Sequence, residues 1–293
     1  MKPTLLSLSI AATIMPSVVE SFSSPATERV DHAMISTYDK LARHAIDSYH
    51  LKNKDNQDES SALWIGLCGG PGSGKSTMVD EVAHRIQELG VEAIAVPMDG
   101  YHYLKSEMED KKFDMKRRGA PWTFNADQLF QDLTFGQQTG TASLPTYCRS
   151  ISDPLPDQVR LEEKHKIIIV EGNYLLLGCL LPEVNVEGSH LSDLTEELGC
   201  GCPYDLKEEI ERWVPVSNLW DESWYVAPGG GFKEQRRRLI ERTLQTWTPE
   251  KSQTWGGGTD REAATRRVDF NDAKNARLIE CCKPYADMTL ESL

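Results

Sequence analysis

The stretch Leu67-Cys68-Gly69-Gly70-Pro71-Gly72-Ser73-Gly74-Lys75-Ser76-Thr77 decides the fold of this chain. From its first glycine it fits the pattern G-x-x-x-x-G-K-[ST], a loop that joins a strand to a helix and cradles phosphates. An apolar run at 63–67 precedes it and an amphipathic stretch follows, which is the context that this loop needs. A plain glycine-rich turn is the alternative, but the Lys-Ser pair would add nothing to such a turn.

The residue types in this loop predict a nucleoside triphosphate as its ligand. Glycines allow the backbone to turn consecutive N–H groups toward an anion, and the positive end of the following helix adds to the attraction. Lys75 is placed to reach the β- and γ-phosphates, and the Ser76 hydroxyl to bind Mg²⁺. The predicted nucleotide-binding residues are Gly70, Pro71, Gly72, Ser73, Gly74, Lys75, Ser76 and Thr77.

Composition limits the class of protein and its partners. The chain has 293 residues, of which 39% are hydrophobic, enough for one sizeable α/β domain. A formal net charge of −13 argues against nucleic acid or an anionic membrane as a partner. The seven cysteines form no C-x-x-C pair with a matching second half, so we expect reduced thiols rather than a zinc site or a disulfide framework.

The first 25 residues have the composition of a targeting segment. Lys2 precedes an apolar run at 5–15 that is too short to span a bilayer. The stretch Val19-Glu20-Ser21-Phe22 resembles the cleavage site of proteins imported into complex plastids. A plastid is therefore expected, with the mitochondrion or the cytoplasm as alternatives and no membrane attachment of the mature form. Residues 26–61 are predicted to form a helix followed by a loop. The helix spans 27–51 and is expected to pack on the edge of the sheet.

The alternation of apolar strands and helices after the phosphate loop predicts an α/β fold with a mainly parallel central sheet flanked by helices. A strand at 91–96 ends just before Asp99. Ligands of such sheets lie beyond the carboxyl ends of the strands. Asp99 is therefore a candidate general base that accepts a hydroxyl proton, although an Asp-Gly turn explains it too.

A second carboxylate, Glu171, directly follows the buried strand pattern Ile167-Ile168-Ile169-Val170. This is where phosphate-loop proteins place the acid that holds Mg²⁺, usually through water, so Ser76 and Glu171 are the predicted metal ligands. A strand-end acid without function is the alternative.

Two polar segments are candidates for binding a phosphoryl acceptor. Residues 105–124 read as a loop in which Arg117 or Arg118 meets an anionic or polyhydroxylated group, or as a solvated basic turn. A helix is predicted at 125–135, and a short strand at 140–145 is followed by a turn. Tyr147 and Arg149 in that turn are acceptor candidates, or simply structural.

Four motifs occur in the order seen in the phosphoribulokinase/uridine kinase family, to which the pantothenate kinases are related. They are the phosphate loop, Met98-Asp99-Gly100-Tyr101-His102, Arg118-Gly119-Ala120-Pro121 with Thr123-Phe124, and Val170-Glu171-Gly172-Asn173-Tyr174 with its three leucines. The chain is most similar to the uridine kinase-like branch, from about residue 63 onward. The resemblance implies a P-loop kinase fold with a lid, the cofactors ATP and Mg²⁺, and Asp99 as base.

The same resemblance divides residues 62–293, the expected kinase domain. Residues 182–216, which contain Cys200 and Cys202, look like an inserted surface loop or helical excursion, and a lid spans about 232–265. Lid arginines would neutralise charge on the transferring phosphoryl, or lie on an exposed basic face. Thr243 stands where family members often carry His. The catalytic candidates are Lys75, Asp99, Arg238 and Arg242. Asn275 is assigned a place near the adenine. The residues assigned to the acceptor are Tyr101, His102, Arg118, Tyr147 and Arg149.

These assignments predict a kinase that transfers the ATP γ-phosphoryl to a hydroxyl of a small metabolite, which is a nucleoside, a sugar or a pantothenate-like molecule. The sequence does not distinguish among these three acceptor classes, and it does not indicate an oligomeric state. A regulatory NTPase switch without an acceptor is the second hypothesis, although the guanine signature Asn-Lys-x-Asp is missing. A binding protein that has lost catalysis is the third.

Overall fold

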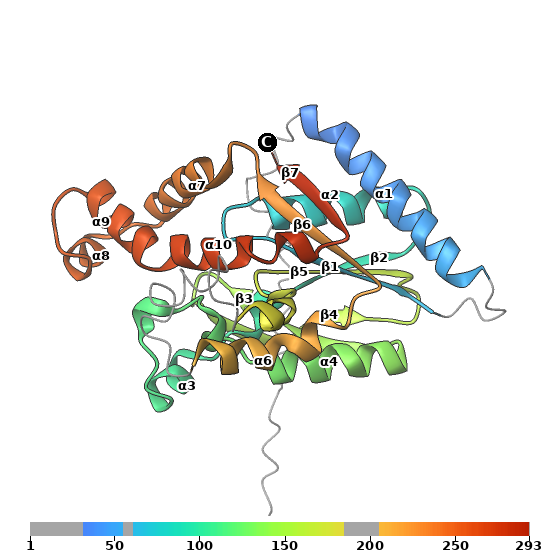
Figure 1. The fold of residues 1–293 in the computed structure, drawn as a ribbon, viewed down its shortest axis with the longest axis horizontal. Helices are drawn as coiled ribbons and strands as arrows, with labels where there is room; N and C mark the ends of the chain where they lie inside the picture. The colour runs from blue at the N-terminus through green and yellow to red at the C-terminus, as the bar shows by residue number, and fades with distance from the viewer. Residues whose placement is uncertain (1–31, 55–60, 185–204, 293) are drawn as a thin grey trace, which may run out of the picture.

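The computed structural model of the protein describes residues 32–54, 61–184 and 205–292 (Figure 1). The predicted targeting segment at 1–25, most of the predicted insertion, and Cys200 and Cys202 lie outside these ranges. Within the three ranges, no helix is both long and apolar enough to cross a membrane.

A five-stranded parallel sheet forms the centre of the molecule, with the strand order β2-β5-β1-β6-β7. Its strands are β1 (Leu63–Cys68), β2 (Ala93–Pro97), β5 (Ile167–Gly172), β6 (Glu222–Pro228) and β7 (Met288–Ser292). The sequence predicted β1, β2 and β5 within a few residues of these bounds. Because the strands are parallel, their carboxyl ends meet at one edge, where the phosphate loop and Glu171 lie.

Alternation along the strands sends side chains to two separate cores. In β1, Ile65 and Leu67 pack on one face of the sheet, whereas Trp64 and Cys68 pack on the other. Helices α1 (His32–Asn53) and α2 (Lys75–Glu88) cover the first face, and α4 (Ala126–Thr139), α6 (Leu206–Ser217) and α10 (Ala273–Glu280) cover the second (Figure 1). This is the three-layer α/β architecture that the sequence predicted.

Helix α1 does not pack on the sheet edge as predicted. Its buried residues share one core with α2 and with β1, β5 and β6. Its polar side also reaches the sheet, because His44 Nε2 lies 3.0 Å from a carboxylate oxygen of Glu222 and Ser48 Oγ donates to that carboxylate at 2.7 Å. The amphipathic pattern identified the buried side of the helix correctly, but periodicity carries no information about which part of a sheet that side meets.

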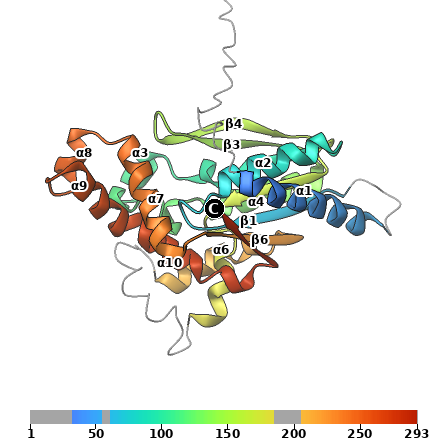
Figure 2. The same cartoon turned by 90° about the horizontal axis from the view of Figure 1, so that it is seen from above.

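The sequence predicted only one of the two strands in the second, smaller sheet. Strands β3 (Ala142–Cys148) and β4 (Asp153–Leu161) form an antiparallel hairpin beside the main sheet (Figure 2). The predicted turn at 147–154 is instead the tip of this hairpin. The sequence did not indicate β4 because it contains Pro154 and Pro156, and proline is depleted in strands. Proline is tolerated in edge strands. Its residues from Pro156 to Gln158 are correspondingly exposed.

Residues 182–216 were predicted to form a surface loop or a helical excursion, and their described end is the helix α6, which packs into the core instead of lying on the surface. Trp213 and Ile210 are fully buried and join the core that α4 and β5 also line. Glu209 is buried with them, where its carboxylate accepts from Trp213 Nε1 at 3.0 Å and from Arg212 Nη1 at 3.1 Å. The described end of this segment is therefore part of the fold.

Replacing Glu209 by Gln is expected to change how stability depends on pH. Burial raises the pKa of Glu209, although Arg212 and Trp213 partly oppose the shift. The folded state therefore holds the proton more tightly than the unfolded chain, so this residue stabilises most at acid pH, and its contribution falls as pH rises through the raised pKa. Urea unfolding of both proteins across pH should show wild type losing free energy of unfolding relative to the variant as pH rises. A difference that is constant with pH would contradict the prediction.

The remaining helices form an arm at one end of the molecule (Figures 1 and 2). They are α7 (Gly231–Gln245), α8 (Pro249–Thr254) and α9 (Asp260–Arg267), and a π-helical turn at Val268–Asp272 continues α9 into α10. Short elements complete the described parts of the chain: the 3₁₀ turns at Met98–Tyr101, Met115–Arg117, Pro121–Thr123, Leu177–Glu183 and Lys283–Tyr285, and α3 (Lys105–Asp110).

Candidate active site

The phosphate loop leads from β1 into α2 and leaves the start of that helix open to a ligand. Gly72 and Gly74 have positive φ angles of 76° and 92°, which favour glycine. Gly74 is the N-cap residue, and no side chain caps the helix. The first N–H groups of a helix lack intrahelical partners and attract anions. The backbone at Lys75 and Ser76 is therefore suited to phosphate oxygens.

Lys75 lies inside the loop with only neutral hydrogen-bond partners. Its side chain is 8% exposed, and Nζ donates to Asn173 Oδ1 at 2.9 Å and to the Gly70 carbonyl at 3.4 Å. The Ser73 hydroxyl next to it is buried without a hydrogen-bond partner. Since a buried ammonium is costly without an anion, these groups fit a polyphosphate in the loop.

The predicted metal ligands Ser76 and Glu171 meet above the loop. The Ser76 hydroxyl donates to a carboxylate oxygen of Glu171 at 3.1 Å. Burial raises the pKa of Glu171; Lys75 lowers it and the nearby Asp99 raises it again. No cluster of three or more His, Cys, Asp or Glu side chains suited to a metal occurs among the described residues. One hydroxyl and one carboxylate suit Mg²⁺, which takes most of its ligands from phosphates and water.

Asp99 lies just beyond β2, in the 3₁₀ turn Met98–Tyr101, and is partly exposed. In the sheet, Pro97 pairs with Glu171, so the two carboxylates follow neighbouring strand ends. Asp99 is close enough to Glu171 for their charges to interact. Its side chain is outside the core, as a general base requires.

Tyr101 and His102, which follow Asp99 in the same motif, point in different directions. Tyr101 is buried, and its hydroxyl donates to Asp132 of α4 at 3.1 Å, so this predicted acceptor contact is part of the interior. His102 stays beside Asp99: its Nδ1 lies 2.8 Å from the Asp99 carbonyl. Burial lowers the pKa of His102, which keeps the ring neutral near pH 7.

Arg118, a predicted acceptor contact, is held by the protein itself. Its Nη2 donates to Asp153 of β4 at 2.8 Å, and its guanidinium lies 5.9 Å from the centre of the Tyr147 ring. The ring of Tyr147 in turn contacts that of His102, with centroids 4.9 Å apart. The hairpin tip, Arg118 and the Asp99 turn thus lie together.

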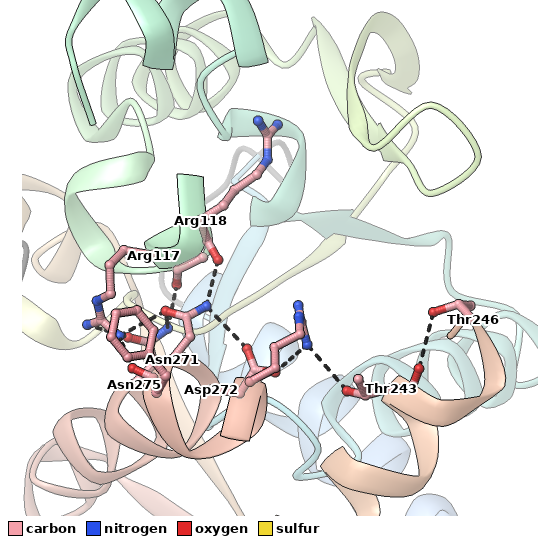
Figure 3. Close-up of polar contacts among 10 residues, drawn as sticks. Arg117, Arg118, Thr243, Thr246, Asn271, Asp272 and Asn275 are labelled. Carbon is pink, nitrogen blue, oxygen red and sulfur yellow. Dashed lines mark hydrogen bonds and ion pairs between the residues drawn. The ribbon is translucent and has the colours of Figure 1, made fainter. Parts of the chain in front are cut away.

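Arg117, the other arginine considered for the acceptor, is 1% exposed and serves the fold. Its Nη1 donates to Asn271 Oδ1 and to the Phe270 carbonyl, both at 2.9 Å (Figure 3). Asn271 returns a bond from Nδ2 to the Arg118 carbonyl at 2.7 Å, and Asn275 Nδ2 donates to the Gly119 carbonyl at 3.0 Å. We name these residues, 117–119 with 270, 271 and 275, the turn clamp.

The clamp changes the interpretation of Asn275. The adenine was its predicted partner, but its amide nitrogen is taken by Gly119 and, at 3.3 Å, by Asn271 Oδ1. Asn275 nevertheless lies near the phosphate loop, since a Cβ on Gly70 would come within 3.3 Å of the neighbouring residue Ala276. The clamp therefore fixes α10 and the 117–119 turn against the phosphate loop.

Replacing Arg117 by Met should lower the free energy of unfolding by about 3 kcal/mol, because charged hydrogen bonds to buried acceptors disappear. The Phe270 carbonyl would lose this donor, and Asn271 Oδ1 would keep only the longer bond from Asn275 Nδ2 at 3.3 Å. Urea unfolding measures the change, with Arg43→Met on the exposed side of α1 as the control. Equal stability of the two variants would show that the clamp contributes nothing.

The lid arginines Arg238 and Arg242 lie one turn apart along α7 and have different surroundings. Arg238 donates from Nε to Glu234 at 3.0 Å and from Nη1 to Ser292 Oγ at 3.2 Å, and Ser292 Oγ in turn donates to the Ser73 carbonyl. It borders an open cleft of about 920 Å³ between α7, α9 and the ends of β6 and β7. Arg242 is exposed at the surface of α7, yet the side chains around its guanidinium remove part of its hydration and lower its pKa, with Asp272 opposing and Arg149 adding to the shift. The charge of Arg242 thus interacts with those of Asp272 and Asp99, whereas Arg238 borders the cleft.

Sequence reasoning missed three residues that shape this site. Asn173 holds Lys75; Gln235 donates to the Pro71 carbonyl at 2.9 Å and so joins the lid to the loop; Asp153 holds Arg118. Asn173 stood within a quoted motif and was not given a role. Gln235 and Asp153 carry no local signal, because their partners are distant in the sequence.

Comparison with known proteins gives a family match over the centre of the chain. The model of the phosphoribulokinase/uridine kinase family matches residues 64–178. A Schizosaccharomyces pombe protein provisionally named a uridine kinase is 37% identical over 159 residues, covering 51% of this chain and 63% of that protein. An ATP-dependent kinase-like protein of Aspergillus versicolor is 28% identical over 187 residues, covering 61% of this chain and 84% of that protein.

One solved structure resembles nearly the whole described fold. It is a protein of Silicibacter sp. provisionally assigned as a fructose transport system kinase, with a TM-score of 0.61 and 25% identity. The match covers 85% of this chain and 98% of that one. The P-loop kinase fold is thereby confirmed. The alignment with the fission yeast protein spans less than two thirds of its length, and the family match contains the phosphate loop, Asp99 and Glu171.

Proposed function

We propose, from the premise that residues 64–178 match the phosphoribulokinase/uridine kinase family, that this protein transfers the γ-phosphoryl of ATP to a hydroxyl of a small metabolite. One observation carries the proposal. Asp99 and Glu171 follow the ends of neighbouring strands, beside a buried Lys75 that has no anionic hydrogen-bond partner. A general base, a metal ligand and a phosphate site thus lie together, as phosphoryl transfer requires.

The triphosphate is assigned to the phosphate loop. Lys75 and the loop amides would bind the β- and γ-phosphates. Ser76 and Glu171 would hold Mg²⁺, which supplies positive charge to the phosphate oxygens.

The chain's own residues then carry the reaction. The Asp99 carboxylate accepts the proton of the acceptor hydroxyl, whose oxygen forms the new bond to the γ-phosphorus as the bond to the ADP oxygen breaks. Arg242, whose charge interacts with that of Asp99, stabilises the negative charge on the transferring group. Water must stay out of this space, and α7 lies directly against the loop through Gln235 and Pro71.

Product identification tests the proposal. The protein is incubated with ATP, Mg²⁺ and a panel of nucleosides, sugars and pantothenate, and mass spectrometry is used to find a phosphorylated acceptor formed together with ADP. Absence of any phosphorylated acceptor would overturn the proposal. ADP release that needs no acceptor and survives Asp99→Asn would instead indicate the regulatory switch, and ATP binding without turnover would indicate a binding protein.

A further inference from the structure

Asn173 lies where the phosphate loop and the turn of the candidate base come together. It directly follows β5, whose last residue is Gly172. A Cβ on Gly172 would lie 2.7 Å from the side chain of Met98, so the end of β5 packs against the turn that carries Asp99. The Asn173 side chain reaches the phosphate loop, where its Oδ1 accepts a hydrogen bond from Lys75 Nζ at 2.9 Å.

The backbone around Asn173 is held from two sides. Its carbonyl accepts from Sγ of Cys68, the last residue of β1, at 3.2 Å. The next residue, Tyr174, is fully buried, and its hydroxyl donates to the Gly119 carbonyl at 2.6 Å. Because both contacts lie in the interior, the Asn173 amide meets the phosphate loop from a rigid support.

The amide orients Lys75 without pairing its charge. A lysine ammonium has three N–H donors and no acceptor, so the oxygen of the Asn173 amide is the atom that faces Nζ. A second donor goes to the Gly70 carbonyl at 3.4 Å. Among the described residues these are the hydrogen-bond partners of Nζ, which leaves one N–H for a phosphate oxygen. Both partners are neutral, so no hydrogen-bonded anion competes with that phosphate.

An amide at this position contrasts with the composition of the chain. Acidic residues outnumber basic ones by 45 to 32, and a buried lysine is ordinarily paired with a carboxylate. A carboxylate at position 173 would form an ion pair with Lys75, and a phosphate would have to displace it. Asparagine has nearly the same shape as aspartate and lacks that charge. The residue type therefore suits a group that keeps Lys75 oriented and available.

We propose that Asn173 is a positioning residue, which holds the Lys75 ammonium in the orientation from which it meets the transferring phosphoryl. This inference rests on the proposed kinase function and extends it to a residue outside the phosphate-loop motif. The effect of Asn173 on the reaction passes through Lys75. Displacing a reacting group or its donor by about 1 Å can cost on the order of 100-fold in rate, so the support of the ammonium matters as much as its charge.

Two variants of Asn173 test the proposal. Asn173→Leu keeps most of the volume and removes the acceptor, so kcat should fall by about 10- to 100-fold through the displaced ammonium. ATP affinity, measured by calorimetry with Mg²⁺, should change much less, because Lys75 and the loop amides remain. Asn173→Asp should instead lower ATP affinity by about 10- to 100-fold, the size of one charged hydrogen bond that phosphate must displace.

The control for the charge change is Gln138→Glu, which converts an amide to a carboxylate at an exposed position of α4 and should match wild type. A double-mutant cycle then separates positioning from a structural role. If Asn173 acts only through Lys75, adding Asn173→Leu to Lys75→Met should leave kcat at the value of Lys75→Met alone. A residue that only supports the fold would lower kcat again, together with the free energy of unfolding in urea.

Three results would overturn the inference while the kinase function stands. They are a wild-type kcat in Asn173→Leu, a further loss of kcat in the double variant, and an unchanged ATP affinity in Asn173→Asp. If wild type phosphorylates no acceptor at all, the proposed function fails. The calorimetric comparison of wild type with Asn173→Asp needs no turnover, so it still decides whether Asn173 controls the availability of Lys75.

Discussion

Replacing Asp99 by Asn is expected to lower kcat by about 100- to 10,000-fold, the contribution of a positioned general base. Asparagine keeps the size of the side chain but cannot accept the hydroxyl proton. The turn that carries Asp99 should remain intact, because its packing uses Gly100 and the His102 ring, and no side-chain hydrogen bond of Asp99 holds it in the described structure. Product formation measured at saturating ATP and acceptor gives the effect.

The control for this variant is Asp47→Asn on the exposed side of α1. ATP affinity, measured by calorimetry, should be equal in wild type and in both variants, since Asp99 lies beyond the phosphate loop. An Asp99→Asn protein with the wild-type kcat would assign this residue to the turn alone. The base would then have to be sought elsewhere at the same sheet edge.

Replacing Lys75 by Met is expected to lower kcat by about 100- to 1,000-fold, the usual cost of losing one preorganised donor to the transition-state charge. ATP affinity should fall as well, because the ammonium contacts phosphate before and during transfer. Methionine fills nearly the same space and leaves the Asn173 side-chain oxygen without its donor at 2.9 Å. Single-turnover kinetics and ATP binding measure the two effects separately.

Stability distinguishes a functional lysine from a structural one. The hydrogen-bond partners of buried Lys75 are neutral, so removing its charge relieves desolvation; this offsets the lost attraction to Glu171, and the free energy of unfolding should change little. A loss of activity that merely follows unfolding would contradict this expectation. Lys40→Met, at an exposed position of α1, serves as the control for both measurements.

Arg117 and Arg118 show where prediction from the sequence stops. Both carry the same charge, and both were considered for the acceptor. Arg117 is buried in the turn clamp, whereas Arg118 is paired with Asp153. Their partners lie 154 and 35 residues away along the chain. No local pattern contains that information, because it depends on how the π-helical turn and the hairpin pack.

The sequence by itself determined the phosphate loop, the central parallel strands, and the position of Asp99 and Glu171 at strand ends. These features follow from neighbouring residues: glycine spacing sets the loop backbone, and runs of β-branched residues favour buried strands. Only the tertiary structure decided that α1 lies on the sheet face, that α6 belongs to the core, and that Arg117 and Arg118 have different partners. The physical reason is that burial and charge pairing are set by contacts between segments far apart in the chain, which periodicity and local motifs do not record.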